Sequence, residues 1–375
     1  MILTNCAACA APLPHPAKQC SRCKTPYCSP ACQKQHWDAG GHKDFCKKIK
    51  KGGGAEQYHA DKKTKEAIAE AVEKCADDTR GQACYICTQA VHWKTKEGLV
   101  RMCACRGTAG FVHVSCLAEQ AKILVAEVEK SNLAGKDKMA RWKRWEACSL
   151  CKQQYHGVVF CALGWACWKT YVGRPEGDPA RQLAMAELGN GLHDAKRHEE
   201  ACSVYEVELS LMRRFGKSED DILRVQGNLA STYQSLGRYE EAISMRRDVY
   251  SGFLRLNGAE NVKTLHEAYN IAQLFVSLGR LEEAKRYLRS MMHATRRLVG
   301  ESHDLTLKMR LLHGQTLYCD KDASLDDLRE AVTTLEDVER TSRRLLGGAH
   351  PNVRSMEESL RQAQAVLRAR EARES

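Results

Sequence analysis

The residues of this chain best suited to chemistry are cysteines and histidines that lie in close pairs between positions 84 and 151. Four pairs follow one another, with two residues inside three of them and one residue inside the other. Eight such soft ligands can hold two tetrahedral zinc ions. They are Cys84, Cys87, Cys103, Cys105, His113, Cys116, Cys148 and Cys151.

A second array of eight ligands occupies residues 6–46, with His36 as a competitor of His42 for one position. Because both arrays offer four ligands per ion, we expect four structural zinc ions per chain, none with an open position that could activate water. The second array consists of Cys6, Cys9, Cys20, Cys23, Cys28, Cys32, His42 and Cys46.

Residues 6–46 resemble the MYND finger over its full length, since both the ligand positions and the filler around Tyr27 and Trp37 agree. The resemblance implies two interleaved zinc sites, and it favours His42 over His36 because the family places its histidine four residues before the last cysteine. It also implies docking of short proline-containing peptides, with a purely structural spacer as the alternative. The implied sites are Cys6, Cys9, Cys28 and Cys32 for one ion, and Cys20, Cys23, His42 and Cys46 for the other.

The spacing in residues 84–151 resembles the RING-CH (RING-variant) finger, a subtype of the ubiquitin-ligase RING. One residue separates Cys103 from Cys105, and seven separate Cys105 from His113. The PHD finger has the same ligand order, but it generally has a shorter gap before the histidine and a tryptophan two residues before the seventh cysteine. In this chain Trp145 lies three residues before Cys148, so we favour RING-CH.

A RING-CH finger would act by assembly and would supply no catalytic residue of its own. The resemblance implies that it binds a ubiquitin-conjugating enzyme and holds the thioester-linked ubiquitin in a reactive pose, without a covalent intermediate on this chain. Ile86 matches the apolar contact on the first zinc loop, and Trp142 or Trp145 would be the groove aromatic. Lys152 stands where a cation bonds to ubiquitin and enzyme, although arginine is commoner there and offers a planar fork.

From Ala180 onward a period of 41 or 42 residues appears, stretched to 47 at the end. It resembles the tetratricopeptide repeat in its kinesin-light-chain-like form, which implies paired helices stacked into a solenoid whose groove takes an extended peptide or a helix. The small residues Ala201, Ala242 and Ala284 let paired helices approach closely. We expect a helix-cap role for the residues three places after each repeat-ending glycine, namely Glu219, Asn261, His303 and His350.

The predicted fold is mainly α, with two small zinc-stabilised modules followed by the repeat solenoid. Gly52, Gly53 and Gly54 indicate a flexible linker, and the apolar segment before the repeats is too short to cross a membrane. A Lys-rich loop is expected after Gly135. The predicted order is a MYND finger at 1–48, a linker and short helix at 49–80, the RING-CH finger at 81–156, a connecting apolar helix at 157–178, and repeats with a C-terminal capping helix at 179–375.

Composition narrows the setting in which the protein works. The first 180 residues hold 28 Lys and Arg against 17 Asp and Glu, which equals the whole net charge of +11. Much of this excess offsets ligand thiolates, so the charge does not favour a nucleic-acid partner. With 19 cysteines and no signal-peptide pattern, we expect a reducing compartment, the cytoplasm first and the nucleus second.

The leading functional hypothesis is a RING-CH ubiquitin-protein ligase that selects a protein substrate through its repeats and MYND finger. The competing hypothesis is a non-catalytic zinc-finger and repeat scaffold for protein–protein interaction. A PHD-like chromatin reader is the third. The expected partners are a ubiquitin-conjugating enzyme and a protein or peptide ligand, with no membrane.

Overall fold

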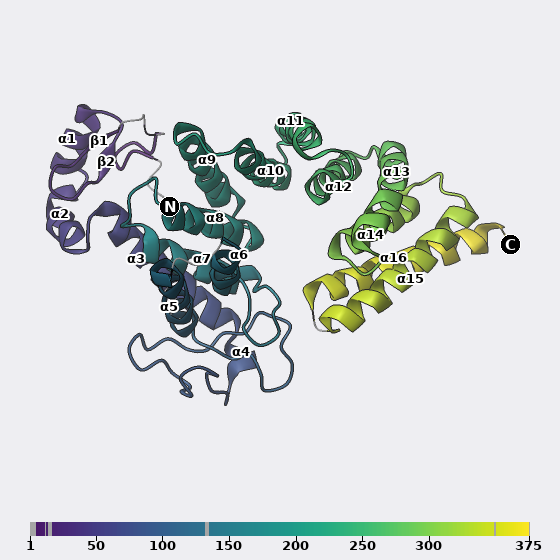
Figure 1. The fold of residues 1–375 in the computed structure, drawn as a ribbon, viewed down its shortest axis with the longest axis horizontal. Coiled ribbons are helices and arrows are strands. Elements are labelled where there is room, and N and C mark those ends of the chain that lie inside the picture. Colours follow the sequence, from purple (N-terminus) through teal and green to yellow (C-terminus); the bar gives the residue numbers. More distant parts are fainter. Residues whose placement is uncertain (1–4, 12, 14–16, 132–134, 349, 375) are drawn as a thin grey trace. The chain divides into compact units, whose positions relative to one another are not determined.

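The structure is a computed structural model that describes residues 5–374 apart from 12, 14–16, 132–134 and 349. The chain divides into two compact units, 1–216 and 217–375. The fold is mainly α, as predicted, with two cysteine-rich modules before an array of helical hairpins in chain order (Figure 1). No helix among the described residues is long and apolar enough to traverse a bilayer.

The first module combines a short hairpin with two helices. Strands β1 (Lys18–Gln19) and β2 (Pro26–Tyr27) pair antiparallel, and helices α1 (Pro30–Asp38) and α2 (His42–Lys51) follow. Ser29 caps α1 by accepting a hydrogen bond from the Cys32 backbone, and proline occupies the first helical position. The core consists mostly of cysteines around Tyr27, so the module has only a small hydrophobic core apart from its candidate metal ligands.

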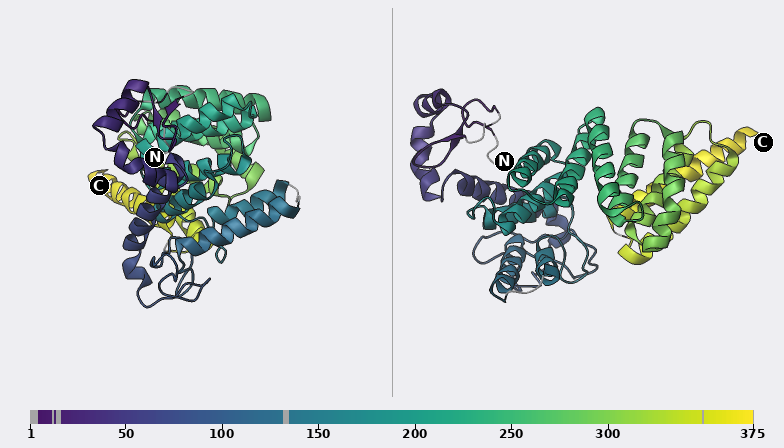
Figure 2. Two further views of the ribbon diagram at one scale, coloured as in Figure 1. Left: turned by 90° about the vertical axis from the view of Figure 1, so that its left-hand side faces the viewer. Right: turned by 45° about the horizontal axis from the view of Figure 1, so that its top comes forward.

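The expected flexible linker is instead mostly helix. Helix α3 (Ala55–Lys74) begins directly after the glycine turn, and the short α4 (Ala76–Thr79) follows it. Its buried residues are small, so α3 packs closely along α7 (Gly157–Tyr171) (Figures 1 and 2). The Thr64 hydroxyl donates to the Trp165 carbonyl at 3.1 Å. Tertiary packing therefore orders a segment whose composition suggested flexibility.

The second module is irregular around its cysteines and helical beyond them. Two isolated bridges, Val100 with Val112 and Ala147 with Gln154, hold its loops. Helix α5 (Val114–Ser131) then pairs with α6 (Gly135–Trp142), which is followed by the 3-10 turn η1 (Lys143–Trp145) (Figure 2). The Lys-rich segment predicted as a loop is thus helical, because it packs against α5.

Helix α7 is apolar on all sides and buried, as such a helix must be. It packs most extensively against α8 (Pro179–Asp194). Gly164 on α7 and Gly191 on α8 permit this close approach, since a Cβ at either position would come within 2.8 Å of a carbonyl oxygen of the other helix. The connecting helix therefore forms a tight hairpin with the first repeat helix.

Helical hairpins make up the rest of the chain. In the first unit α8 pairs with α9 (His198–Arg214). In the second unit three hairpins are followed by α16 (Pro351–Glu374), which packs on α15 and α14. The hairpins are α10 (Glu219–Ser235) with α11 (Tyr239–Asn257), α12 (Val262–Ser277) with α13 (Leu281–Val299), and α14 (Asp304–Cys319) with α15 (Leu325–Leu346).

The repeated positions play the roles that their spacing predicts. Ala201, Ala242 and Ala284 are fully buried inside their hairpins. Asn261 and His303 cap α12 and α14 by accepting backbone hydrogen bonds. His350 accepts a hydrogen bond from the Asn352 backbone at the start of α16. In the first of these helices, α10, the cap is Ser218 rather than the expected Glu219, which is the first helical residue.

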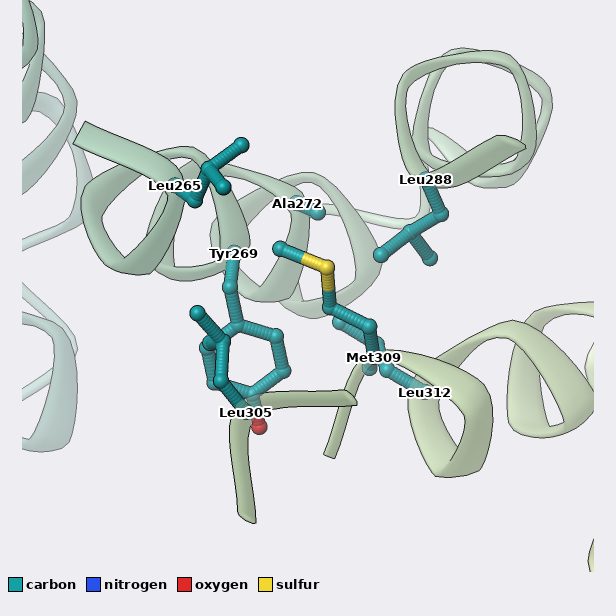
Figure 3. Packing of buried hydrophobic residues seen from close by; sticks show 7 residues of the cluster. All are labelled: Leu265, Tyr269, Ala272, Leu288, Leu305, Met309 and Leu312. Carbon is teal, nitrogen blue, oxygen red and sulfur yellow. The ribbon is translucent and has the colours of Figure 1, made fainter. Parts of the chain in front are cut away.

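An apolar core and one buried ion pair hold the second unit together. Figure 3 shows the side chains that α12, α13 and α14 contribute to the core, with Met309 and Tyr269 facing one another across it. Arg246 of α11 donates to Glu267 of α12 at 2.8 Å and to the Ser231 hydroxyl of α10 at 2.6 Å, and all three helices are thereby linked. Both charged side chains are buried.

Candidate metal centres and the exposed face of the second finger

The first module gathers its eight ligands into two clusters, in the interleaved grouping that the resemblance implied. Within each cluster the ligand atoms all lie within 4.8 Å of one another. The Cys9 and Cys28 sulfurs are 3.5 Å apart, and those of Cys20 and Cys46 are 3.8 Å apart. The clusters are Cys6, Cys9, Cys28 and Cys32, and Cys20, Cys23, His42 and Cys46.

The structure places His42, and not His36, in the second of these clusters. His42 is buried, and its Nε2 lies 3.4 Å from the Cys23 sulfur. His36 instead makes a 3.1 Å hydrogen bond through Nδ1 to the Tyr27 hydroxyl. Its ring also lies 5.1 Å from the ring of His42, so it supports the ligand from outside the cluster.

The second module also forms two interleaved clusters, one from the first and third ligand pairs and one from the second and fourth. His113 points Nδ1 at the sulfurs of Cys87 and Cys116, at 3.4 and 3.7 Å. Its other nitrogen lies 3.4 Å from the Ala90 carbonyl, the usual type of second partner for a ligating histidine. The clusters are Cys84, Cys87, His113 and Cys116, and Cys103, Cys105, Cys148 and Cys151.

The separations fit zinc. A tetrahedral ion with Zn–S bonds of about 2.3 Å requires sulfurs about 3.8 Å apart. Four sulfur pairs within these clusters lie 3.5 to 3.8 Å apart, and none of the 19 cysteines, all of them described, is in a disulfide. Each cluster combines three or four cysteines with at most one histidine, the donor set of structural zinc sites. The four sites therefore fit four structural zinc ions.

Four of the Cys-x-x-Cys pairs share one turn, which aims both sulfurs at one point. The residue after each pair has a left-handed backbone, with φ between 59° and 63°, and its N–H donates to the carbonyl of the first cysteine at 2.8 to 3.0 Å. Such a conformation is costly for a side-chain residue, so the turn is stabilised from outside its own backbone. The four left-handed residues are Ala10, Lys24, Thr88 and Lys152.

A fifth turn of the same form uses no cysteine. Lys96 has φ of 60° and donates its N–H to the His92 carbonyl at 2.9 Å. In this turn His92 Nδ1 accepts the Thr95 backbone N–H at 3.1 Å, in the place where two sulfurs would meet a metal. Glu97 ties the turn to the start of α5 through the Ser115 backbone and hydroxyl, both at 2.7 Å. This turn is held by hydrogen bonds alone.

The surroundings favour the metal-binding forms of both histidines and of Cys84, but not of every thiol. Burial lowers the pKa of His113 and of His42, which keeps both imidazoles neutral. Burial by itself would raise the pKa of Cys84, but backbone N–H groups of Cys87, His113 and Ile86 outweigh it and leave this pKa below its ordinary value. Burial and neighbouring thiols instead raise the pKa of Cys46 and of Cys105 to about 11, so an ion that binds these thiols must displace their protons.

Two of the predicted partner-binding residues are wrong. Trp142 is only 4% exposed and Trp145 is fully buried, so neither can line a groove for a conjugating enzyme. Both contact Tyr171 of α7, and the Trp142 indole donates to Glu187 of α8 at 2.9 Å. The tryptophan pair anchors the finger to helices α7 and α8, because packing on the apolar α7 removes both indole rings from water.

The other two predicted residues remain accessible. Ile86 is half-buried on the first zinc loop, and Lys152 is exposed. The Tyr85 and Ser149 hydroxyls are 2.9 Å apart, and this contact joins the first ligand loop to the last. The Lys152 ammonium donates to the Ser149 carbonyl at 2.6 Å, so it turns toward the same loop.

Sequence reasoning missed three exposed apolar residues of this finger. Leu150, between the last two ligands, is 48% exposed, and it follows the residue whose hydroxyl contacts Tyr85. Trp93, at the tip of the metal-free turn, is 69% exposed, and Val91 beside it is also exposed. The position of Leu150, inside the last ligand pair as Ile86 lies inside the first, was the available signal.

Comparisons with known proteins agree with this geometry. The MYND finger model matches residues 6–46, and the RING-variant domain model matches residues 84–153. Tetratricopeptide repeat models match residues 181–255 and 268–304. The chain therefore carries a MYND finger, a RING-variant finger and tetratricopeptide repeats, as the sequence predicted. The RING-variant match agrees with RING-CH rather than with PHD.

Among solved structures the chain is similar to repeat proteins. Two crystal structures of the nearly identical TPR-like repeats of a Podosopora anserina putative kinesin light chain share 16% and 17% identity with it, with TM-scores of 0.38 and 0.37, and each comparison covers 62% of this chain and 97% of that one. BtubC (BKLC) from P. vanneervenii shares 15% identity over 69% of this chain and 91% of its own, with a TM-score of 0.37. No curated protein matches the sequence.

Proposed function

We propose that this protein is a RING-CH-type ubiquitin ligase that selects a protein substrate through its repeats and its MYND finger. The observation that carries the proposal is the second finger, in which a complete pair of zinc clusters within the RING-variant match supports an accessible apolar face. The protein would contribute position rather than covalent chemistry, since every candidate metal donor is used within a four-ligand cluster.

The proposed contact face combines Ile86, Leu150 and Lys152. The Tyr85–Ser149 contact holds the two ligand loops together, so the two aliphatic side chains flank one rigid element. Lys152 would bond to the conjugating enzyme and to its linked ubiquitin once its ammonium leaves the Ser149 carbonyl. A small apolar anchor beside a cation is a common arrangement at protein interfaces.

The decisive experiment is a discharge assay with purified zinc-loaded protein. The protein is added to conjugating enzymes charged with ubiquitin, and loss of the thioester to free lysine is followed for a panel of such enzymes. We expect Ile86→Ala and Leu150→Ala each to slow discharge about tenfold, the effect of losing about 1.4 kcal/mol of contact energy. Ile123→Ala, which removes an aliphatic side chain of α5 that is also exposed, should leave the rate unchanged.

The competing function is a non-catalytic scaffold. It is favoured by one observation, the burial of both tryptophans that were expected to contact a conjugating enzyme. Silence of the whole enzyme panel, with four zinc ions per chain verified by metal analysis, would establish the scaffold and reject the ligase. Equal slowing by Ile86→Ala and Ile123→Ala would reject the proposed face.

The expected cellular setting and partners of the ligase follow from the same residues. Zinc-ligating thiols persist in a reducing compartment, so we place the ligase in the cytoplasm, with the nucleus second. Its partners would be a conjugating enzyme at the RING-CH finger and a protein or peptide ligand at the repeats and the MYND finger. Fractionation of cells that express the tagged chain tests the first point, and crosslinking to captured partners tests the second.

A further inference from the structure

A polar cavity lies between the last two hairpins of the second unit, apart from any feature of the fingers. Its volume is about 370 Å³. It is formed by the end of α13, the connection to α14, the middle of α14 and the last turns of α15. The residues that line it are Arg296, Glu301, Ser302, Arg310, Asp337, Thr341 and Arg344.

Three guanidinium groups meet two carboxylates in this cavity. Arg310 is the most buried of the three, with a side chain that is 12% exposed. The Asp337 carboxylate lies 2.7 Å from Nη2 of Arg310, and Nε of Arg310 has no hydrogen-bond partner among the described residues. Arg344 forms no ion pair with any residue that the structure describes. The cavity is therefore lined by cations whose bonding capacity is incompletely used.

Glu301 is only loosely held. Its carboxylate lies 3.3 Å from Arg296 and 3.7 Å from Arg310, and its side chain is 62% exposed. Exposed ion pairs at such distances contribute little stability. A stronger anion could replace this carboxylate at both arginines, and the remaining lining would then hold three positive charges and the one negative charge of Asp337.

The cavity coincides with a departure from the repeat. In the preceding hairpin Arg297, three residues before the glycine that ends the repeat, forms an ion pair with Glu260. Arg344 has the same position before Gly347, but Ser302 stands where Glu260 stands. Of these two hairpins, only the second lacks the acidic partner of the repeated arginine, and the cavity lies at that position.

A second departure supplies the buried cation. Arg310 lies seven residues after the cap His303, and the equivalent position seven residues after the cap Asn261 is Ala268, which is fully buried. A large cation therefore stands where the preceding hairpin has a small core residue, and Ser302 stands where that hairpin has a carboxylate. Two independent positions change in the direction that favours an anion.

We infer that this cavity binds a phosphoryl group, carried on a phosphoserine or phosphothreonine of a protein partner of the repeats. A phosphoryl group brings a charge of about −1.5 to −2 and three strong acceptor oxygens, which match three convergent guanidinium groups once Glu301 has moved away. The Ser302 and Thr341 hydroxyls are further donors at the rim. A carboxylate, with two oxygens and one charge, would use only part of this lining.

The inference is tested by binding alone, without ubiquitin, so that its failure is separate from failure of the proposed ligase. The probe is blocked phosphoserine, N-acetyl-phosphoserine-N-methylamide, titrated into the full zinc-loaded chain and followed by the NMR signals of the arginine Nε–H groups. Blocked serine and blocked glutamate are titrated in parallel. We expect saturable binding of phosphoserine, at least about tenfold tighter than that of glutamate, because the phosphoryl group has one more acceptor oxygen and a larger negative charge than the carboxylate.

Matched variants locate the site. Arg344→Ala, and Ser302→Glu which restores the acid of the preceding hairpin, should each weaken phosphoserine binding about tenfold or more. Arg297→Ala, at the equivalent but paired arginine, should leave affinity unchanged. Glu301→Gln should tighten binding, whereas Glu260→Gln, the same charge change one hairpin earlier, should not.

Three outcomes would overturn the inference. They are absence of saturable phosphoserine binding to the unmodified chain, glutamate binding as tight as that of phosphoserine, and equal losses in Arg297→Ala and Arg344→Ala. Circular dichroism of each variant establishes that its helices are intact, so a loss of binding is assigned to the cavity.

Discussion

The two fingers and the helical repeats hold their shapes by different means. In the fingers an irregular backbone converges on ligand clusters, and four turns adopt the same costly left-handed conformation to aim their sulfurs. In the repeats, apolar seams such as the cluster around Met309 and Leu288 provide the cohesion. A metal cluster fixes the backbone and leaves neighbouring side chains free to serve a partner. A repeated seam fixes side chains, so a residue that departs from the repeat can be recognised by comparing equivalent positions of the hairpins.

Removal of zinc should produce the largest effect, and it should separate the two regions. Structural zinc contributes about 10 kcal/mol or more to the folding of small modules, so a strong chelator should unfold both fingers. The second unit contains one cysteine, Cys319, outside every ligand cluster, and it should keep its helices. Metal analysis should find four zinc ions released, while circular dichroism should retain most of the helical signal. Concerted loss of all helix would show that the repeats depend on the metal as well.

Breaking the buried ion pair should cause the largest loss of stability within the repeats. Glu267→Ala leaves Arg246 charged and buried without its carboxylate, which should destabilise the second unit by about 3–5 kcal/mol. Urea unfolding, with hydrogen exchange of α10 to α12 as the local probe, measures the loss. The double variant Arg246→Met with Glu267→Leu is the control and should recover most of it, whereas equal damage in both would show that the charges themselves are required.

A smaller effect should appear as the pH falls. Burial lowers the pKa of His313 to about 4, helped by the positive charges of Arg289, Lys285 and Arg296. The unfolded chain then binds the proton more readily, since the free imidazole has a pKa near 6.5, so stability falls between about pH 6.5 and pH 4. The loss should approach about 3 kcal/mol, and the His313→Leu variant should show a flatter stability curve over this range. An unchanged slope would assign the acid sensitivity to another group.

The smallest expected change is a gain. Lys196 has φ of 62° at the turn of the first repeat hairpin, where the next two hairpins have Gly237 and Gly279. A left-handed conformation costs a side-chain residue about 1–2 kcal/mol, and glycine avoids this cost. Glycine also raises the conformational entropy of the unfolded chain, which offsets part of the gain, so Lys196→Gly should stabilise the first unit by up to about 1 kcal/mol.

Thermal unfolding of the Lys196→Gly variant measures this gain, with Lys196→Ala as the comparison that should show none. The equivalent change at Lys152, in a turn that a ligand cluster holds, tests the same strain beside a metal. Lys152→Gly should bring a similar gain in stability only if the left-handed conformation of Lys152 remains strained when the metal is bound. A loss of stability in Lys196→Gly would mean that the lysine side chain makes a favourable contact at this turn.

Much of the candidate site could be predicted because ligand chemistry is local. The spacing of the cysteines identified the ligand pairs, and the MYND resemblance implied the interleaved grouping of the first finger and favoured His42 over His36. The position of the tryptophans could not be predicted in this way. The RING-CH resemblance implied that Trp142 or Trp145 lines a partner groove, and only their packing against α7 shows that they are buried.

The fold was predicted best where it repeats. The period identified the hairpins and the caps Asn261 and His303, because each unit repeats the same turn and seam. The segment between the fingers was predicted worst. A short helix was predicted in it, but the glycines and lysines before that helix indicated a flexible linker, whereas α3 already begins at Ala55 and buries a face of small residues that includes Ala60 and Ala67. That face is stable only against α7, which lies about a hundred residues further along the chain.

Helix α3 has a mechanical consequence for how the two fingers would cooperate. The Ala55 backbone donates to the Cys23 carbonyl of the first finger at 2.8 Å, and both carboxylate oxygens of Glu56 accept from Nη2 of Arg181 at 3.1 Å. The helix is therefore a strut anchored at its start rather than a tether. In the ligase proposed above, this strut would limit which lysines of a ligand held by the MYND finger come within reach of the RING-variant finger.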